Sequence, residues 1–252
     1  MLGIFDSGIG GLTVVKELLR RHPSAGFVYL GDTARTPYGN KSADTIRQHA
    51  VEDARFLVGK GAATILVACN TVSAVAMHEL RHAFPVVNFF EVIEPAVSKA
   101  KGKKIGVIGT RATIASCVYE KQLKEQDAKV TVISQACPLF VPLVEEHWTQ
   151  KSETKRIART YLEPLRKAQI DCLILGCTHY PLLLDVIKNS LQKRVRIIDS
   201  PSALMDVVER EAAEAIVDGE QKYYFTDPSP MTDAIATRWL KKMVRGERAV
   251  LL

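Results

Sequence analysis

Short apolar runs rich in β-branched residues recur along the whole chain, and amphipathic stretches of helical period separate them. Strands that alternate with helices build βαβ units with parallel strands, so the sequence predicts an α/β protein. The expected strands are Leu2–Asp6, Phe27–Gly31, Thr64–Ala68, Val86–Phe90, Lys104–Gly109, Lys129–Ser134, Asp171–Gly176 and Arg194–Asp199. The expected helices include Leu12–Arg21, Ala43–Lys60, Ser73–Ala83, Ser116–Gln126 and Ser152–Lys167.

The second half of this pattern repeats the first. In each half the opening strand is followed by a small polar group, and the third strand leads into a cysteine, Cys69 or Cys177. These cysteines are 108 residues apart, as are the expected starts of the fourth strands at Val86 and Arg194. The repeat predicts two similar parallel-sheet domains related by pseudo-twofold symmetry.

We expect the first domain to be discontinuous, with residues 1–94 and 201–252, and the second to span residues 95–200. The tail around Tyr223–Thr226 has no counterpart between the halves and is expected to pack on the first domain. Ligands of open parallel sheets bind outside the carboxyl ends of the strands. The predicted active site is therefore the interdomain cleft, with Cys69 and Cys177 on its opposite sides.

Two facing thiols can invert a stereocentre, because one removes a proton from one face of a carbon and the other returns a proton to the opposite face. The alternative is that both are buried as small hydrophobes, as free cysteines often are. Their matched positions, each followed by polar residues, favour the chemical interpretation. Packing roles are expected for Cys117, Cys137 and Cys172, which lack such a pattern.

Composition narrows the class of protein further. Five cysteines are an odd number and lie inside apolar runs, so we expect reduced thiols and a cytoplasmic location. The longest uncharged run, Gly61 to Met77, is shorter than the ~20 residues of a membrane-spanning helix, and Met1 leads straight into a strand without a leader. No membrane association is expected.

The formal charge of +6 favours anionic partners in general. The basic residues are scattered, with one mild cluster near the carboxyl terminus. Its helical spacing predicts a solvated helix face, and we expect no nucleic-acid groove. The cluster consists of Arg238, Lys241, Lys242, Arg245 and Arg248.

The segment Asp6–Gly11 (DSGIGG) ends the first strand and opens a helix. It matches neither the P-loop nor the GxGxxG pattern. Amides at a helix start favour an anion, so a carboxylate ligand is expected there, with Asp6 receiving an ammonium group or assisting a thiol. Arg35–Gly39 has the composition of a turn.

His179 stands two residues beyond Cys177, which suits a general acid/base helper. No second Cys or His pair stands at zinc-ligand spacing, so no metal is expected. The remaining histidines are expected at the surface or in packing roles: His22, His49, His78, His82 and His147. Glu145 becomes relevant if it points into the cleft near Cys177. No lysine stands out as a Schiff-base former, but the residues by themselves leave a pyridoxal phosphate cofactor open.

Taken together, these segments resemble the glutamate racemases of the aspartate/glutamate racemase family. The matching motifs occur in family order up to about Pro181, and a closing segment follows at Tyr224–Asp227 (YFTD). The motifs are Ile4–Gly11 (IFDSGIGG), Gly31–Gly39 (GDTARTPYG), Val67–Thr71 (VACNT), Gly106–Thr110 (GVIGT), Ala136–Glu145 (ACPLFVPLVE) and Leu175–Pro181 (LGCTHYP).

The resemblance implies a cofactor-independent racemase that supplies D-glutamate for peptidoglycan. By residue match, Cys69 would deprotonate D-glutamate and Cys177 would deprotonate L-glutamate. Asp6 would lie beside the first thiol, and Glu145 and His179 beside the second. The matched substrate-binding positions are Asp6, Ser7, Pro37, Tyr38, Gly39, Asn70, Thr71, Thr110, Thr113, Thr178 and His179.

Two departures from the family pattern stand out. The chain starts at the first strand, so regulation by a peptidoglycan precursor through an amino-terminal extension is not expected. After Glu145-Glu146 the family often has glycine, and His147 stands there instead.

Three other functions remain open from the sequence: a racemase of aspartate or another amino acid, a binding role such as DNA gyrase inhibition, and a thiol hydrolase. The hydrolase would leave the second matched cysteine unexplained. A homodimer is in keeping with the family, but no interface is predicted.

Overall fold

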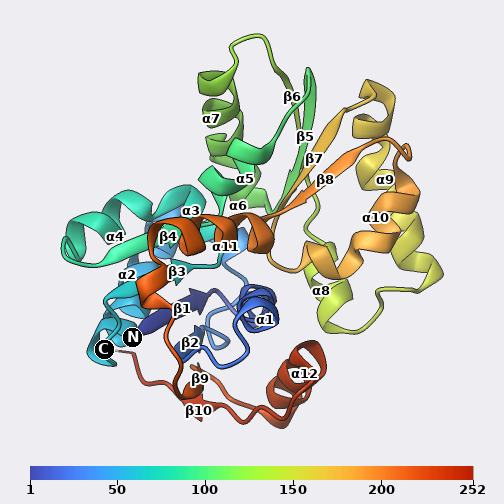
Figure 1. Cartoon of the computed structure of the whole chain (residues 1–252). Helices are drawn as coiled ribbons and strands as arrows, with labels where there is room; N and C mark the ends of the chain where they lie inside the picture. Colours follow the sequence, from blue (N-terminus) through green and yellow to red (C-terminus); the bar gives the residue numbers. More distant parts are fainter. Residues whose placement is uncertain (252) are drawn as a thin grey trace.

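Two parallel sheets organise the described residues, 1–251, of the computed structural model (Figure 1). The first lobe has a six-stranded sheet in the order β10-β9-β2-β1-β3-β4, and the second lobe has a four-stranded sheet in the order β6-β5-β7-β8. The strands of the first lobe are β1 (Leu2–Asp6), β2 (Phe27–Gly31), β3 (Thr64–Val67), β4 (Asn88–Glu91), β9 (Gln221–Phe225) and β10 (Glu247–Arg248). Those of the second are β5 (Lys104–Gly109), β6 (Thr131–Ala136), β7 (Cys172–Gly176) and β8 (Arg196–Asp199).

The predicted duplication is confirmed by strand order. The arrangement β2-β1-β3-β4 in one lobe repeats as β6-β5-β7-β8 in the other, and every pairing within them is parallel. Three predicted strands begin two residues later than expected, namely β4, β6 and β8. The expected tail strand is β9, which extends the first sheet by parallel pairing with β2.

Helices cover both sheets. The helices are α1 (Leu12–Arg21), α2 (Ala43–Gly59), α3 (Asn70–Val75), α4 (Met77–Ala83), α5 (Ile93–Lys99), α6 (Arg111–Ala115), α7 (Val118–Gln126), α8 (Phe140–Glu145), α9 (Ser152–Ala168), α10 (Leu184–Ser190), α11 (Ser200–Glu211) and α12 (Pro230–Leu240). Three 3-10 turns are η1 (Tyr38–Asn40), η2 (Tyr180–Leu183) and η3 (Ala213–Ala215). None of the helices in residues 1–251 has the length and apolarity needed to cross a membrane.

Three helix predictions need correction. The expected helix Ser73–Ala83 is two helices, α3 and α4, because Ala76 leaves the helical region with φ −124° and ψ 0°. The expected helix Ser116–Gln126 begins only at Val118, because Cys117 has a left-handed backbone with φ 57°. The basic cluster is not one helix face: α12 ends at Leu240, so only Arg238 of the five residues lies on it.

The two lobes exchange a helix. Helix α5 follows β4 of the first lobe but packs on α7, β7 and β8 of the second. Helix α11 follows β8 of the second lobe and contacts β7 and β8 there, but it also packs on α1 and β4 of the first lobe. Helices α5 and α11 pack on each other as well (Figure 1). The chain therefore crosses between the lobes twice, and the predicted domain boundaries at 94/95 and 200/201 fall at the starts of these helices. That division, whose last residue lies outside the described range, stays our proposal.

One apolar core runs through both lobes. It includes β1 and α1 residues of the first lobe, β5 and β7 residues of the second, and α5 and α11 residues between them. A second cluster fills the space between the first sheet and α2. Strands buried on both faces need continuous apolar runs, which explains why β1, β2 and β7 are buried along their whole length.

Candidate active site

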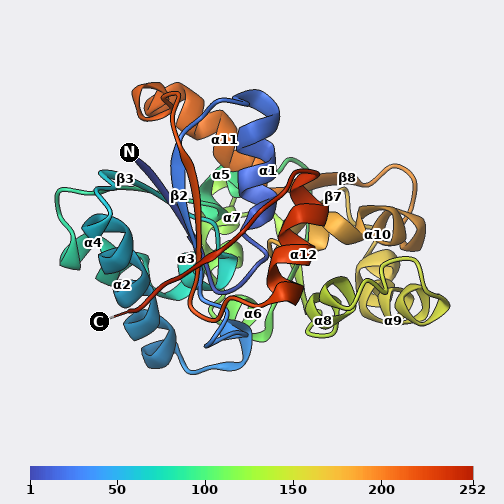
Figure 2. The ribbon, with the colours of Figure 1, turned by 90° about the horizontal axis from the view of Figure 1, so that it is seen from below.

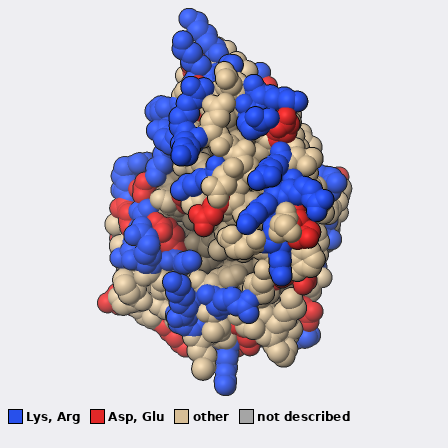
Figure 3. Space-filling view, turned by 90° about the vertical axis from the view of Figure 1, so that its right-hand side faces the viewer, with Lys and Arg blue, Asp and Glu red and all other residues tan. Residues whose placement is uncertain are grey.

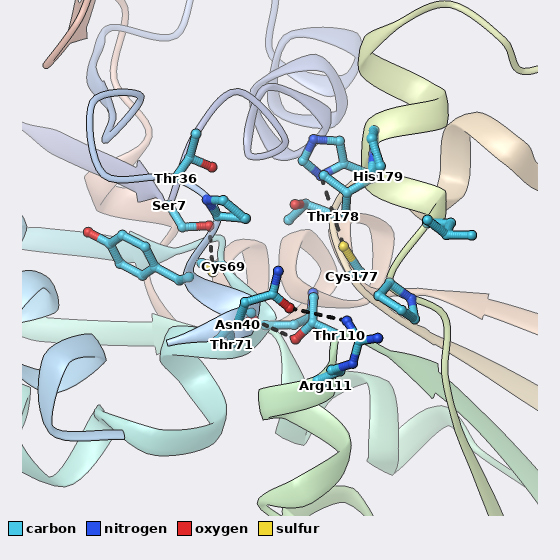
Figure 4. A pocket seen from close by; sticks show the side chains of 18 of the residues that line it. Ser7, Thr36, Asn40, Cys69, Thr71, Thr110, Arg111, Cys177, Thr178 and His179 are labelled. Atoms are coloured by element: carbon cyan, nitrogen blue, oxygen red, sulfur yellow. Dashed lines mark hydrogen bonds between the residues drawn. The ribbon is translucent and has the colours of Figure 1, made fainter. Parts of the chain in front are cut away.

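A cavity of about 510 Å³ lies between the lobes, at the carboxyl ends of β1, β3, β5 and β7 (Figure 4). The two matched cysteines lie on its opposite walls, as predicted from the duplication. Its lining residues are Ser7, Thr36, Pro37, Tyr38, Gly39, Asn40, Cys69, Asn70, Thr71, Thr110, Arg111, Pro138, Leu139, Val141, Pro142, Glu145, Tyr161, Cys177, Thr178 and His179.

Cys69 lies at the end of β3, immediately before α3. Its Sγ donates to the Ser7 Oγ at 3.3 Å, and the residue is 5% exposed. Burial, and then the nearby Asp6 carboxylate, raise the pKa of the Cys69 thiol to about 12. At neutral pH this group is therefore a neutral thiol, which can donate a proton.

Cys177 belongs to a chain of three polar groups. Its Sγ is 3.9 Å from the Nδ1 of His179, and the Nε2 of His179 is 2.9 Å from the Oε1 of Glu145. Burial by itself lowers the pKa of His179, but the hydrogen bonds with Cys177 and Glu145 outweigh it and raise that pKa to about 10. His179 can therefore hold a proton beside the second thiol at neutral pH.

The tail helix α12 completes the surroundings of His179. The Trp239 ring lies edge-on to the imidazole, with 5.8 Å between the ring centroids. Figure 2 shows α12 between the two lobes, and it packs on α1. Sequence reasoning missed this contact, because nothing in the pattern around Trp239 indicates which lobe α12 faces.

The residues that directly follow Cys69 and Cys177 are each hydrogen-bonded by the opposite lobe. Asn70 Oδ1 accepts a hydrogen bond from the Tyr119 hydroxyl at 2.6 Å, and Thr178 Oγ1 donates to Asp6 Oδ1 at 3.5 Å. The Thr178 carbonyl also accepts from the Thr13 hydroxyl at 3.0 Å. These cross-lobe bonds fix the two walls of the cavity relative to each other.

Three threonine hydroxyls meet at the carboxyl end of β5. Thr110 Oγ1 is 2.9 Å from Thr71 Oγ1 and 3.0 Å from Thr113 Oγ1, and it also caps α6 by accepting from the Thr113 amide. Thr71 and Thr110 line the cavity, whereas Thr113 is buried behind them and does not. The cluster presents hydroxyl groups suited to a carboxylate ligand.

The glycine-rich segment has a use that the sequence analysis did not foresee. A Cβ on Gly10 would lie 2.3 Å from Thr178 Oγ1 and 2.5 Å from His179 Nδ1, so the missing side chain makes room for the opposite lobe. Only Ser7 of Asp6–Gly11 lines the cavity. Asp6 is buried behind it and accepts a hydrogen bond from the Gly8 amide at 3.1 Å.

The turn predicted at Arg35–Gly39 contributes Pro37, Tyr38 and Gly39 to the cavity wall. The hydroxyl of Tyr38 points elsewhere: it donates to Asp32 and lies 3.0 Å from Asp53 Oδ2. Arg35 forms ion pairs with Asp32 at 2.6 Å and with Asp53 at 3.1 Å. A ligand at this wall would thus meet the backbone of Tyr38 and not its hydroxyl.

Several lining residues were missed by sequence reasoning. Thr36 and Asn40 flank the Pro37–Gly39 turn, and Arg111 follows Thr110 directly, so adjacency was an available signal for these. Arg111 Nη1 donates to Asn40 Oδ1 at 3.5 Å across the cleft (Figure 4). The apolar wall has no such signal, because it depends on how α8 and α9 pack: Pro138, Leu139, Val141, Pro142 and Tyr161.

The other cysteines divide into two groups. Cys137 and Cys172 are fully buried, so their predicted packing role is confirmed. The same prediction is wrong for Cys117, which is exposed because its left-handed turn before α7 lies at the surface. In residues 1–251, no three His, Cys, Asp or Glu side chains are grouped as a metal site would require.

The positive charge of the chain belongs to the second lobe. Residues 95–200 contain 18 of the 34 Lys and Arg residues but only 10 of the 28 Asp and Glu residues. Figure 3 views the side that carries α9 and α10 and shows Lys and Arg side chains gathered over much of that face. Such a field attracts anionic ligands toward the molecule.

The chain is similar to known racemases over nearly its whole length. Residues 13–208 match the model of the Asp/Glu/hydantoin racemase family. The glutamate racemase of Aquifex aeolicus is 46% identical over 254 residues, covering 98% of this chain and 94% of that one. The glutamate racemase of Geobacter metallireducens is 45% identical over 225 residues, covering 87% and 81%. The crystal structure of the Francisella tularensis glutamate racemase in complex with D-glutamate superposes with a TM-score of 0.93 at 33% identity, covering 99% and 97%.

Proposed function

This chain belongs to the aspartate/glutamate/hydantoin racemase family, and we propose that it interconverts L-glutamate and D-glutamate by a two-thiol mechanism without a cofactor. The observation that carries the proposal is the placement of Cys69 and Cys177 on opposite walls of one interlobe cavity. Relatives named glutamate racemase support the choice of substrate, and one of them was crystallised with D-glutamate.

The chemistry is a proton transfer in two steps. One cysteine, as thiolate, removes the α-proton of the bound amino acid and becomes a thiol. The carbanion-like centre then takes a proton from the opposite thiol, which becomes the thiolate, and the configuration at the α-carbon is inverted. Cys69 deprotonates D-glutamate and Cys177 deprotonates L-glutamate, so the enzyme alternates between two protonation states.

Neighbouring groups assist each thiol differently. The buried Asp6 carboxylate favours the protonated form of Cys69, and Asp6 hydrogen-bonds through Thr178 to the opposite wall. His179, held by Glu145, keeps a proton next to Cys177. The negative charge that develops on the substrate is stabilised by the fixed polar groups that line the cavity.

Polar groups around the cavity suit the two carboxylates and the ammonium group of glutamate. The hydroxyls of Ser7, Thr71, Thr110 and Thr178 and the backbone of Pro37–Gly39 face it. Asn70 also lines the cavity, and its Nδ2 is buried without a hydrogen-bond partner in residues 1–251. Thr113 acts indirectly, because it holds Thr110 from behind.

Chiral chromatography of reactions with L- and D-glutamate and L- and D-aspartate tests the substrate assignment. We expect both glutamate enantiomers to be converted and aspartate to react far more slowly. Cys117→Ser, at an exposed cysteine outside the cavity, is the matched control and should leave the rate unchanged. Turnover of aspartate alone would replace the proposed substrate.

The biological setting is a further part of the proposal: the D-glutamate supplies peptidoglycan synthesis. Growth of a D-glutamate-requiring bacterium on expression of this chain tests it, and failure of active protein to restore growth would contradict it. Inhibition of DNA gyrase and dimer formation stay predictions. Charge reversal at Arg238 and Lys241, which lie outside the cavity, should weaken a gyrase contact and spare racemisation.

A further inference from the structure

The side chain of Asn70 joins the cavity to the seam between the lobes. Asn70 opens α3, directly after Cys69, and is 2% exposed. Its Oδ1 accepts from the Tyr119 hydroxyl at 2.6 Å and lies 3.4 Å from the Ser200 hydroxyl, while its Nδ2 has no partner in the described chain. The oxygen of this side-chain amide is therefore hydrogen-bonded, whereas, within residues 1–251, its nitrogen is not.

Tyr119 is the main donor to Asn70. The Ser200 hydroxyl has a single proton, and its 2.9 Å hydrogen bond to the Leu175 carbonyl is much shorter than its contact with Asn70. The Tyr119 hydroxyl makes a short bond of 2.6 Å, and burial raises the pKa of Tyr119 far above its usual value. It therefore stays protonated and donating at every pH at which the enzyme works.

The ring of Tyr119 is held in place from the second lobe. It lies on α7, is 2% exposed, and packs against Gly176, the residue before Cys177. A Cβ on Gly176 would be 3.1 Å from the Tyr119 Cε2, so the absence of a side chain allows this approach. Tyr119 thus contacts the strand end that carries one thiol and bonds the residue that follows the other.

We propose that Tyr119 is a positioning residue of the racemase: its hydroxyl crosses the lobe seam and holds Asn70 Oδ1, and so fixes the start of α3 beside Cys69 in the cavity wall. The proposal rests on the proposed function. Asn70 lies between Cys69 and Thr71, which both line the cavity, so a shift of its side chain would move the start of α3 relative to a bound ligand. Holding Asn70 in advance spares that movement when substrate binds.

The kinetic test is Tyr119→Phe, which removes one hydroxyl and keeps the ring. Loss of one hydrogen bond predicts a rise of about fivefold in KM for both enantiomers, with kcat changed less than about twofold. Tyr180→Phe is the matched control, because it also removes a buried hydroxyl, bonded to the Cys137 carbonyl at 2.9 Å. It should lower the melting temperature to a similar extent and leave KM unchanged.

A double-mutant cycle shows whether Tyr119 acts through Asn70. In the Asn70→Ala background, Tyr119→Phe should have no further effect on KM, because the group that it positions is gone. Independent effects that multiply would overturn the proposal, and so would an unchanged KM for Tyr119→Phe itself.

A spectroscopic measurement separates this inference from the proposed function. The side-chain amide signal of Asn70 in ¹⁵N NMR, assigned by its loss in Asn70→Asp, should shift or broaden in Tyr119→Phe and stay in place in Tyr180→Phe. An unmoved signal in Tyr119→Phe would overturn the positioning role whatever the substrate. Parent protein that leaves glutamate unchanged would overturn the proposed function, while the amide signal would still decide on Tyr119.

Discussion

At the scale of residues, single charges make the two thiols unlike each other. The carboxylate of Asp6 is beside Cys69, whereas His179 with its raised pKa is beside Cys177. In the proposed two-thiol mechanism one sulfur is protonated while the other is free, and the roles then reverse. The Asp6 carboxylate favours the protonated form of Cys69.

Alkylation of Cys69 tests this preference. Its pKa of about 12 implies that the reactive thiolate is scarce at neutral pH and that iodoacetamide labelling accelerates as pH rises toward that value. Asp6→Asn removes the negative neighbour, which lowers the pKa and should speed labelling at a given pH. Peptide mapping by mass spectrometry distinguishes the sites, with the exposed Cys117 as internal reference. An equal labelling rate of Cys69 in the parent protein and in Asp6→Asn would contradict the proposed effect of Asp6 on the Cys69 pKa.

His147 shows a local conflict between sequence and backbone. It follows α8 with φ 58°, in the left-handed region that glycine adopts without strain. The glycine often found there in the family therefore has a backbone reason. We expect His147→Gly to raise the free energy of unfolding by about 1 kcal/mol. Arg159→Gly, at an exposed position within α9, should lower it by about 1 kcal/mol, as measured by urea denaturation. A destabilised His147→Gly would refute the explanation.

At the scale of elements, the site residues lie at the carboxyl ends of strands. Glycines without side chains allow the two lobes to pack closely there. A Cβ on Gly10 would enter the space of Thr178 and His179. Gly10→Ala should therefore displace His179 or widen the cleft, and reduce kcat/KM by about 100-fold. Gly59→Ala is the control, since nothing lies within 4 Å of its added Cβ, and steady-state kinetics should be unaffected. Normal kcat/KM in Gly10→Ala would show that the close contact is dispensable.

The strands and the cysteines at their ends could be predicted from the sequence. Buried parallel strands appear as continuous apolar runs, so eight strands were placed within about two residues, and the cysteines at their ends were found from the repeat. The break at Ala76 and the apolar wall around Tyr161 were not found, because they depend on packing between distant segments. The same holds for Tyr119, whose partner Asn70 is 49 positions away in the chain.

At the scale of the whole molecule, the exchange of α5 and α11 ties the lobes together. Helix α5, which follows β4 of the first lobe, packs on the second lobe. Helix α11, which follows β8, packs on both lobes, and one apolar core runs through both. We therefore expect a single cooperative unfolding transition in calorimetry, with equal calorimetric and van't Hoff enthalpies. Two separated transitions would show that the lobes fold as independent domains.

The repeat in the sequence indicated two similar lobes, but not this exchange. Spacing fixes which segments correspond, and it carries no information about which lobe a crossover helix packs on. The site depends on that detail, since Asn70 is bonded by α7 and Thr178 by the β1 and α1 region of the opposite lobe. Each wall of the cavity is consequently held by hydrogen bonds from the opposite lobe.

The central claim is that one thiol removes the α-proton of the substrate and the opposite thiol delivers a new proton to the other face. Proton NMR in deuterated water with L-glutamate, followed by chiral chromatography of the products, tests it most directly, on the parent protein and on Cys69→Ser and Cys177→Ser. The account predicts loss of the α-proton signal together with appearance of D-glutamate for the parent, and no D-glutamate for either variant. Continued racemisation by either variant would contradict the two-thiol mechanism.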